Sequence, residues 1–511
     1  MSEKEIELVK INFDGQDIEV PSGTNLIDVA KSQNTEVPHY CYHPDLSAPG
    51  NCRMCQMEVE GAPKLMIGCC TNVRDGMVVK SHKTSQKVKD TQSANLELIL
   101  INHPMDCTVC DQAGHCKLQD YHYEYNAKNS RFIEQKVNKP KAKSLGPTVI
   151  LDAERCIMCT RCIRFCDEIT ETSELGMINR GDKSEIDIHP DFPLNNELSG
   201  TVVDLCPVGA LTHKKWRFNT RIWYTDSKDS ICTGCSKGCN VKVHTRDDQI
   251  VQVKANYNED VNKEWLCDYG RYGLEDYDYK NRVDSFYKDQ KKVERSVLND
   301  VISVLNSESV IILDLSLSYE ELFLIKNLIT DTDITVSVIN NQKELSKVEK
   351  ILMSSDLSAN IEAFKEIFNG YERVVEFNEF KKDNYDKFKN IIIIGDNDKN
   401  NLNELSQDLY SFIANKDSAL FSGSRVVIPV ESVLEKTGIY KNTNLRYQYK
   451  DKVLNSKNSL AKSLEELLSK KGNKEFSFEN DRELTLKVIE KVENFQNLKI
   501  KDFKKGVLIE Q

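Results

Sequence analysis

The segment His103-Pro-Met-Asp-Cys107-Thr-Val-Cys110-Asp-Gln-Ala-Gly-His-Cys116 places one imidazole and three thiols within a short stretch of chain. Thiolate and imidazole groups bind soft and borderline metals. Taken alone, this spacing is compatible with a zinc site that has three cysteine ligands and one histidine ligand. His115 competes with His103 for the fourth position, but it adjoins Cys116, and neighbouring residues seldom face one metal. We therefore expect His103 to be the ligand.

The 17 cysteines of the 511-residue chain all lie at or before Cys267. The first residues, Met-Ser-Glu-Lys-Glu-Ile, lack the basic and apolar regions of an export signal. We therefore expect a reducing compartment, in which disulfides are disfavoured. Closely spaced cysteines in such a compartment point to metal binding.

Before this segment, the sequence predicts a small mixed β domain. Residues 6–13 and 16–20 alternate as two strands around the turn Asp14-Gly15. Residues 24–31 suit a helix capped by Thr24, residues 55–59 a strand, and residues 83–101 a second helix.

The loop that follows the first helix begins a set of four cysteines, which are Cys41, Cys52, Cys55 and Cys69. Two cysteines on a tight loop, with two others brought in by the fold, is the general plan of a plant-type [2Fe-2S] site. The first gap is longer here than in the plant-type spacing, so zinc or buried free thiols remain alternatives. Cys70 adjoins Cys69, and we expect Cys69 to be the ligand and Cys70 to be spare.

Cys156-x2-Cys159-x2-Cys162-x3-Cys166 matches the run of bacterial ferredoxins, in which the fourth cysteine serves a second cluster and is followed by proline. Here Asp167 follows Cys166, and the only Cys-Pro pair is Cys206-Pro207. The simplest interpretation is a single [4Fe-4S] cluster on Cys156, Cys159, Cys162 and Cys206, without Cys166. Zinc is the less favoured alternative.

A last cysteine set comprises Cys232, Cys235, Cys239 and, after 27 intervening residues, Cys267. Residues 240–253 alternate as a hairpin around Asp247-Asp248, and this hairpin would return the chain to the first three cysteines. Four thiolates in such a cage would hold either [4Fe-4S] or zinc.

After residue 276 the pattern changes to short apolar strands between helical segments, which indicates an α/β domain. Residues 309–315, 334–339 and 390–395 read as strands, and residues 319–329 and 402–413 as helices. Residues 452–511 read as helical, charged and peripheral.

The net charge of −11 argues against a nucleic-acid-binding surface. The sequence has no apolar run of about 18 residues that would span a membrane. Any membrane association is therefore expected to go through partner proteins.

In their order, the four sets resemble those of the large iron–sulfur subunit of respiratory complex I, the bacterial NADH-quinone oxidoreductase, whose mitochondrial counterpart is the 75-kDa subunit. The match is strong up to about residue 275 and weaker beyond it. Residues 435–448, Glu-Lys-Thr-Gly-Ile-Tyr-Lys-Asn-Thr-Asn-Leu-Arg-Tyr-Gln, are similar to a late family motif, with Asn444 and Leu445 in place of its Glu and Gly. This departure, and the lack of any cysteine after Cys267, argue against a bound molybdopterin.

The resemblance implies one [2Fe-2S] and three [4Fe-4S] clusters. It assigns the binuclear cluster to Cys41, Cys52, Cys55 and Cys69, and the tetranuclear clusters to His103, Cys107, Cys110 and Cys116, to Cys156, Cys159, Cys162 and Cys206, and to Cys232, Cys235, Cys239 and Cys267. The last of these sites is absent from the mitochondrial relatives, and its presence here suggests a bacterial chain.

The fold implied is multidomain, α+β and α/β. Its expected parts are a plant-type ferredoxin (β-grasp) domain over 1–80, a [4Fe-4S] domain with one histidine and three cysteine ligands over 81–138, a ferredoxin-like segment over 139–218, a molybdopterin-oxidoreductase-type [4Fe-4S] domain over 219–275, and a reduced, cofactor-free molybdopterin-oxidoreductase-like domain over 276–511.

The function implied is electron relay within NADH:quinone oxidoreductase, with no substrate chemistry in this subunit. The expected partners are the flavin and NADH-binding subunit, a small [2Fe-2S] subunit, a ferredoxin-like two-cluster subunit and the quinone-arm subunits. The expected place is the cytoplasmic side of the bacterial inner membrane. The alternatives are a relay subunit of a NAD-linked hydrogenase or formate dehydrogenase, and a zinc-stapled scaffold.

Overall fold

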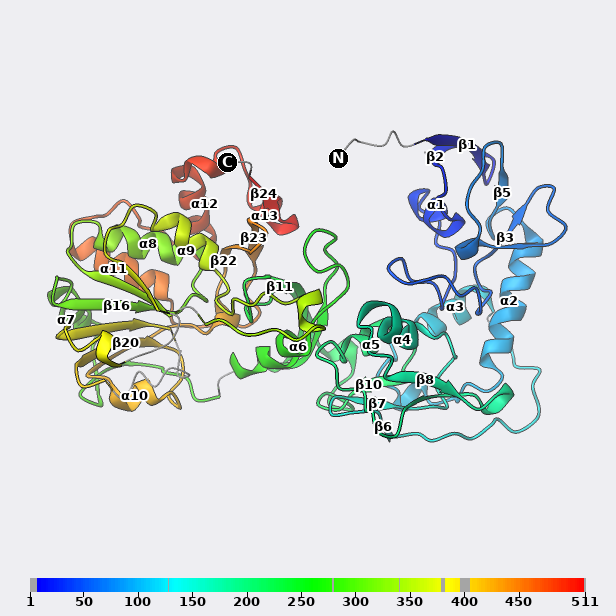
Figure 1. Ribbon diagram of the computed structural model, residues 1–511, viewed down its shortest axis with the longest axis horizontal. Helices are drawn as coiled ribbons and strands as arrows, with labels where there is room; N and C mark the ends of the chain where they lie inside the picture. Colours follow the sequence, from blue (N-terminus) through cyan, green and yellow to red (C-terminus); the bar gives the residue numbers. More distant parts are fainter. Residues whose placement is uncertain are drawn as a thin grey trace. The chain divides into compact units, whose positions relative to one another are not determined.

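The computed structural model describes residues 7–126, 128–277, 280–339, 341–377, 382–395 and 405–509 (Figure 1). The chain divides into two compact units, Met1–Tyr224 and Thr225–Gln511. Each unit has its own sheets, so each is described by itself. No helix among the residues described is both long enough and apolar enough to cross a membrane.

The first unit begins with a five-stranded mixed sheet in the order β2-β1-β5-β3-β4. Its strands are β1 (Leu8–Phe13), β2 (Gln16–Pro21), β3 (Gln56–Val59), β4 (Met66–Ile67) and β5 (Val78–Lys80). The predicted hairpin is confirmed, with Asp14 and Gly15 at positive φ in its turn, while Ile6 lies outside the described residues. Helix α1 (Leu26–Ser32) buries its apolar residues in the core of this sheet.

The cap of α1 differs from the prediction by one residue. The side-chain oxygen of Asn25 accepts hydrogen bonds from the N–H groups of Ile27 and Asp28, both at 3.0 Å. Thr24 instead donates its hydroxyl to the carbonyl of Pro21 at 2.8 Å. Asparagine caps helices at least as well as threonine, and the sequence pattern did not separate the two neighbours.

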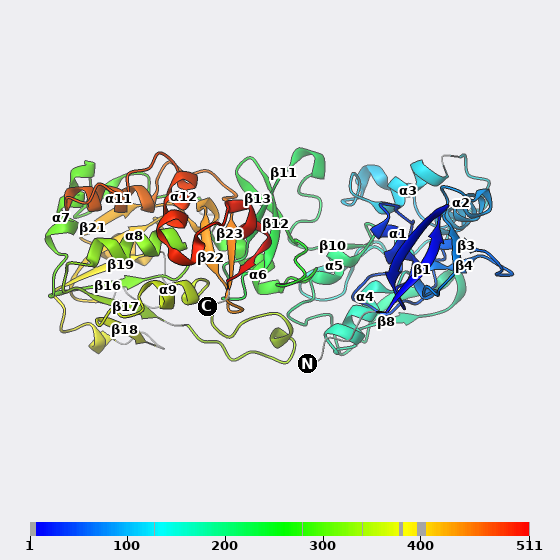
Figure 2. The same ribbon diagram turned by 90° about the horizontal axis from the view of Figure 1, so that it is seen from above.

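The rest of the first unit is mostly irregular chain between short elements. The helices are α2 (Gln86–Leu100), α3 (Lys117–Tyr125), α4 (Arg161–Arg164), which continues as a π-helical turn (Phe165–Ile169), and α5 (Thr201–Leu205). The strands are β6 (Lys143–Ser144), β7 (Val149–Leu151) and β10 (Leu211–His213) in one sheet, and β8 (Leu175–Ile178) and β9 (Glu185–Ile188) in another. Helix α2 lies beside β3 in Figure 2 and confirms the predicted helix, with a later start after the cap Ser85.

The second unit begins with a three-stranded antiparallel sheet and the short helix that follows it. These elements are β11 (Asp226–Ile231), β12 (Asn240–Arg246), β13 (Gln249–Ala255) and α6 (Asp268–Gly273). The predicted hairpin is thus confirmed, and Asp247 and Asp248 adopt positive φ in its turn.

An eight-stranded sheet forms the body of this unit in the order β15-β14-β21-β20-β19-β16-β17-β18. The bounds are β14 (Phe286–Lys288), β15 (Lys291–Val293), β16 (Ser309–Leu313), β17 (Thr335–Ile339), β18 (Val374–Phe377), β19 (Asn390–Ile394), β20 (Asp408–Ile413) and β21 (Val426–Pro429). The six strands from β21 to β18 are parallel. The predicted α/β character is therefore confirmed.

Helices cover both faces of this sheet (Figure 1). The helices that follow β15 are α7 (Leu298–Ser303), α8 (Tyr319–Ile329), α9 (Ile361–Ile367), α10 (Ala419–Gly423), α11 (Leu460–Lys470), α12 (Asp481–Lys491) and α13 (Ile500–Lys505). Of these, α12 packs on α8, and α13 packs on a smaller sheet. Ile311 and Leu313 face the core formed with α8 and α11, whereas Val310 and Ile312 face the core on the other side. A third sheet contains β22 (Gly438–Lys441), β23 (Arg446–Lys450) and β24 (Val507–Leu508).

Two predictions for this unit are wrong. Residues 408–413 form strand β20 and not a helix; residues 402–404 of the same prediction lie outside the described residues. Leu409 to Ile413 are buried on both faces of the sheet, and a short apolar run of this kind does not separate a strand from a buried helix. The C-terminal segment is helical as predicted, but it is not peripheral, because Leu464, Val488 and Phe503 have no exposed surface.

Candidate metal centres

The Cys41 site comprises the thiols of Cys41, Cys52, Cys55 and Cys69. The sulfur atoms of Cys41 and Cys52 lie 3.3 Å apart. Hydrogen bonds with Cys52 and Cys69 lower the pKa of Cys41, and a hydrogen bond with Cys69 lowers that of Cys55. Cys70 is exposed, and its thiol lies 3.6 Å from the carbonyl of Ala48. The fold therefore brings the four predicted ligands together and leaves Cys70 at the rim.

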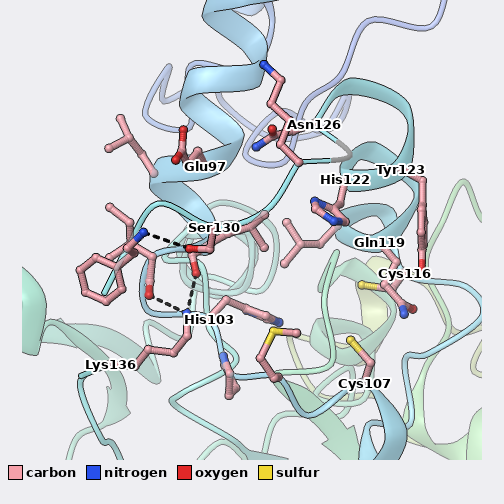
Figure 3. Close-up of a pocket in the computed structure, with 18 of the residues that line it drawn as sticks. Glu97, His103, Cys107, Cys116, Gln119, His122, Tyr123, Asn126, Ser130 and Lys136 are labelled. Carbon is pink, nitrogen blue, oxygen red and sulfur yellow. Dashed lines mark hydrogen bonds between the residues drawn. The ribbon is translucent and has the colours of Figure 1, made fainter. Parts of the chain in front are cut away.

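The His103 site comprises His103, Cys107, Cys110 and Cys116, which all line a cavity of about 1260 Å³. Burial lowers the pKa of His103 to about 4, so its ring is neutral near pH 7. Its Nδ1 is buried without a hydrogen-bond partner. Figure 3 shows Cys107 and Cys116 with their sulfur atoms in the same part of this cavity. A neutral imidazole with an unpaired Nδ1, beside three thiols, fits a ligand role.

The other two histidines near this site differ in position. His122 lies on α3 and lines the cavity in Figure 3, whereas His115 is not among the lining residues in the described chain. His115 accepts a hydrogen bond at its carbonyl from the Gln112 side chain, at 3.2 Å. His103 thus lines the cavity with the three cysteines, but so does His122, whose Nδ1 is also buried without a hydrogen-bond partner. The choice of His103 as the ligand stays a prediction.

Arg155, Arg221 and Gly209 surround the His103 site. Arg221 donates to the carbonyl of Cys110 at 2.5 Å. Arg155 is 4% exposed and pairs with Asp106 and Asp152, both at 3.2 Å. A Cβ placed on Gly209 would lie 2.2 Å from the sulfur of Cys110, so no side chain fits there. The role of Gly209 was not predicted, because the contact joins segments about a hundred residues apart; a glycine three residues after Cys206 is its only sequence signal.

The Cys156 site comprises Cys156, Cys159, Cys162 and Cys206, which line one small cavity with apolar walls. Burial raises the pKa of Cys156, Cys159 and Cys206 to about 11, and it also raises the pKa of Cys162. Between the cysteines, Met158 and Thr160 adopt positive φ. The tight turns that result let the backbone N–H of Met158 bond to the Cys156 sulfur. Cys166 is fully buried but does not line this cavity.

The Cys232 site comprises Cys232, Cys235, Cys239 and Cys267, whose exposed fractions are 5%, 6%, 4% and 4%. Backbone N–H groups of Gly234 and Gly270 donate to the sulfurs of Cys232 and Cys267 at 3.4 and 3.3 Å. A Cβ on Gly270 would lie 2.8 Å from the Cys232 sulfur. Hairpin β12–β13 returns the chain to α6, which Cys267 precedes, as the sequence indicated.

Side chains of the late motif, residues 435–448, pack beside Cys239 of the Cys232 site. The Asn442 side chain donates to that of Gln448 at 3.2 Å, and Gln448 donates to Asn240 at 2.9 Å. A Cβ on Gly238 would lie 2.9 Å from the same Gln448 oxygen. Asn442 and Gln448 therefore hold the turn that leads into Cys239.

No group of three or more His, Cys, Asp or Glu side chains in the described parts of the chain is placed to hold a single metal ion. The fit to polynuclear clusters rests on the donor sets and cavities above. Three sites offer four thiols each, and the His103 site offers three thiols and a neutral imidazole. These are the ligand types of iron–sulfur clusters.

Four family models match the chain in sequence order. They are the 2Fe-2S iron-sulfur cluster binding domain (7–84), the NADH-ubiquinone oxidoreductase-G iron-sulfur binding region (92–131), the ferredoxin-like domain of NADH-quinone oxidoreductase subunit 3 (146–212) and the molybdopterin oxidoreductase Fe4S4 domain (225–278). Each matched range contains one of the four ligand sets in full.

Curated relatives of the chain are named as subunits of NADH-quinone or NADH-ubiquinone oxidoreductase. The G subunit of NADH-quinone oxidoreductase from Rickettsia conorii is 37% identical over 331 residues, which are 63% of this chain and 49% of that protein. The NADH-ubiquinone oxidoreductase 75 kDa subunit of Reclinomonas americana is 34% identical over 380 residues, 74% of this chain and 51% of that protein. The chain thus spans about half the length of the curated relatives it matches.

Among solved structures, the crystal structure of a NAD+-reducing [NiFe]-hydrogenase in the H2-reduced state matches 42% of this chain and 91% of its own chain, with 26% identity. Its TM-score is 0.38, and at that value the likeness carries no argument. The family models and the curated relatives carry the assignment: the chain is a homologue of the G subunit, or 75 kDa subunit, of NADH-quinone oxidoreductase, with iron–sulfur domains of that family.

Proposed function

We propose that this chain is an electron-relay subunit of an NADH:quinone oxidoreductase. Electrons would come from a flavin-bearing subunit, pass through clusters in this chain and leave toward quinone. The observation that carries the proposal is that each of the four cysteine sets gathers in the fold, in the same order as the family models that match.

The proposed ligand sets follow the four sites. One [2Fe-2S] cluster would bind at the Cys41 site, and three [4Fe-4S] clusters at the His103, Cys156 and Cys232 sites. When bound, each cluster supplies a one-electron carrier whose potential depends on ligand type, hydrogen bonds and burial. The hydrogenase or formate dehydrogenase alternative gains no specific support from the geometry.

The chain's own residues hold the ligands in place and keep water away. Cys41, Cys55, Cys69 and the four thiols of the Cys232 site are each less than a tenth exposed. Backbone N–H groups point to sulfur at Cys156, Cys232 and Cys267, and such bonds favour the more negative, reduced state. The neutral His103 removes one negative charge relative to a thiolate, which also favours reduction.

The proposed partners are a flavin and NADH-binding subunit, a small [2Fe-2S] subunit, a ferredoxin-like two-cluster subunit and the quinone-arm subunits. The proposed place is the cytoplasmic face of a bacterial membrane, reached through that complex. Co-purification with a tagged flavin subunit tests this assignment. A chain that purifies with clusters but never with such a subunit would contradict it.

The ligand sets are tested with the full chain purified without oxygen. Reduced wild-type protein should show one binuclear and three tetranuclear signals in electron paramagnetic resonance (EPR) spectra. His103→Ala should alter one tetranuclear signal, and the matched variant His115→Ala should alter none. Equal spectra for His103→Ala and wild type would remove His103 from the ligand set.

A second pair of variants separates Cys166 from Cys206. Cys206→Ser should abolish the signal of the Cys156 site, and Cys166→Ser should preserve it.

Iron and zinc analysis of a variant that lacks the other three sites tests the Cys232 site. Zinc in place of about four irons there would replace the fourth cluster by a structural metal.

A further inference from the structure

Arg164 lies on α4, between the backbone of the Cys41 site and the backbone of the Cys156 site. Its guanidinium donates to the carbonyl of Cys41 at 2.5 Å and to the carbonyl of Cys159 at 3.3 Å. It also donates to the carbonyl of Ser47 at 2.5 Å and to the hydroxyl of Thr160 at 3.3 Å. One side chain thus contacts a proposed ligand residue of each of two clusters.

The charge of Arg164 is buried, and its hydrogen bonds go to carbonyl and hydroxyl oxygens. The residue is 8% exposed. Arg155 shows the contrast, since it is also buried but pairs directly with Asp106 and Asp152. A buried cation normally requires a counter-charge. The contacts with the carbonyls of Cys41 and Cys159 place this positive charge beside the ligand residues of both sites.

Neighbouring contacts fix the same two segments to each other. Glu168, one turn after Arg164, accepts hydrogen bonds from both the N–H and the hydroxyl of Ser47, at 2.8 and 2.5 Å. Asn51 donates its side chain to the carbonyl of Met158 at 3.2 Å. Arg161 donates to the carbonyl of Tyr42. The loop that carries Cys41 and Cys52 is therefore held against the turn that carries Cys156 and Cys159.

We propose that Arg164 is a positioning residue that links the Cys41 and Cys156 sites, fixes the separation of their clusters and raises the reduction potential of both. The proposal rests on the proposed function, because it requires clusters at both sites. A fixed positive charge favours the reduced state, which carries one more electron, and it acts strongly where water is excluded. Because the same guanidinium contacts both ligand backbones, its removal affects the two clusters together.

The test uses the full chain purified with its clusters, in the variants R164Q and R164K and the surface control R180Q. Arg180 lies in the same unit and is exposed. The midpoint potentials of the binuclear and tetranuclear signals are measured by redox titration followed by EPR. R164Q should shift the potentials of the Cys41 and Cys156 clusters together to more negative values, R164K should restore most of the shift, and R180Q should match wild type.

The results separate this proposal from the proposed function. Wild-type protein without iron–sulfur signals would contradict the proposed function itself. Normal wild-type signals with unchanged potentials in R164Q, or a shift at only one of the two clusters, would overturn the role of Arg164. If R164Q does not retain these clusters, R164K decides. Loss of both the Cys41 and the Cys156 signals in R164Q, with both signals present in R164K, would support the link; loss of only one of the two signals in R164Q, or of both in R164K as well, would overturn it.

Discussion

The His103 site and the Cys232 site have similar donor sets but opposite surroundings. The His103 site lies on irregular chain at a cavity of about 1260 Å³, and Cys107 is exposed. The Cys232 site lies between the ends of regular strands, and none of its thiols is more than 6% exposed. The four-ligand pattern alone therefore does not determine how well a site excludes water.

The two sites also differ in what holds them. Side chains from distant segments, Arg155 and Arg221, bind the backbone of the His103 site. The Cys232 site is enclosed by the α/β part of its own unit, through Ser236 N–H to the carbonyl of Asp356 at 2.9 Å and Thr443 N–H to the carbonyl of Ser236 at 2.8 Å. We expect the first site to depend on a few contacts and the second on the stability of a domain.

The largest effect is expected from Gly209→Ala. The new Cβ would lie 2.2 Å from the Cys110 sulfur, so the backbone or the thiol must move, and the EPR signal of the His103 site should be nearly lost. Gly176→Ala is the control, because a Cβ there meets no atom within 4 Å. A normal EPR signal in Gly209→Ala would show that the His103 site can accommodate the added methyl group. It would contradict the view that this site depends on a few close contacts.

A pH-dependent effect is expected in the domain that encloses the Cys232 site. Burial raises the pKa of Glu320 from 4.5 to about 7, and its carboxylate accepts from Ile439 N–H at 2.9 Å and from the Thr485 hydroxyl at 2.6 Å. The folded state thus keeps a proton that the unfolded state releases, so stability falls as pH rises from 4.5 to 7. Glu320→Gln lacks this dependence, and between these pH values it should gain on the order of 3 kcal/mol relative to wild type.

Hydrogen exchange of the α8 amides, measured at pH 5 and pH 7.5 in both proteins, provides this comparison. The EPR signal of the Cys232 site should show the same dependence on pH as the stability of this domain, and the EPR signal of the His103 site should not. A pH-independent difference between Glu320→Gln and wild type would mean that Glu320 is ionised in the fold.

The next effect concerns access of a chelator. Iron should leave the His103 site about tenfold faster than the Cys232 site, the factor that corresponds to about 1.4 kcal/mol in the free energy of local opening. Oxidised protein is incubated with chelator, samples are reduced at intervals, and the decay of the two EPR signals of the reduced clusters is measured. Equal rates would indicate that exposure of Cys107 does not control cluster release.

The smallest effect is expected from Gln448→Ala. The variant loses the hydrogen bonds to Asn240 and Asn442 behind Cys239, which contribute about 1 kcal/mol each. Iron release from the Cys232 site should accelerate several-fold, and the His103 site should be unaffected. Gln496→Ala, at an exposed position, is the control. An unchanged rate of iron release in Gln448→Ala would show that these hydrogen bonds do not limit access to the Cys232 site.

The sequence predicted those features that depend on local spacing. Helix α8, the hairpin β12–β13 and the short gaps within each cysteine set are of this kind. Strand β20 was not predicted, because burial on both faces hides the alternation of a strand. The contact between Arg164 and Cys41 joins residues 123 positions apart, and nothing in either local sequence indicates it. Whether the arginines near the Cys156 run are solvated or buried could be decided only from the fold, in which Arg155 and Arg164 are buried.

The four residues from Cys206 to Gly209 belong to two sites at once. Cys206 lines the Cys156 cavity, Pro207 has its carbonyl 4.0 Å from the Cys116 sulfur, and Gly209 packs on Cys110. A one-residue insertion or deletion in this span would displace both sets of ligands. Assembly of the His103 and Cys156 sites is therefore coupled through this short segment, and a mutation within it would impair both sites.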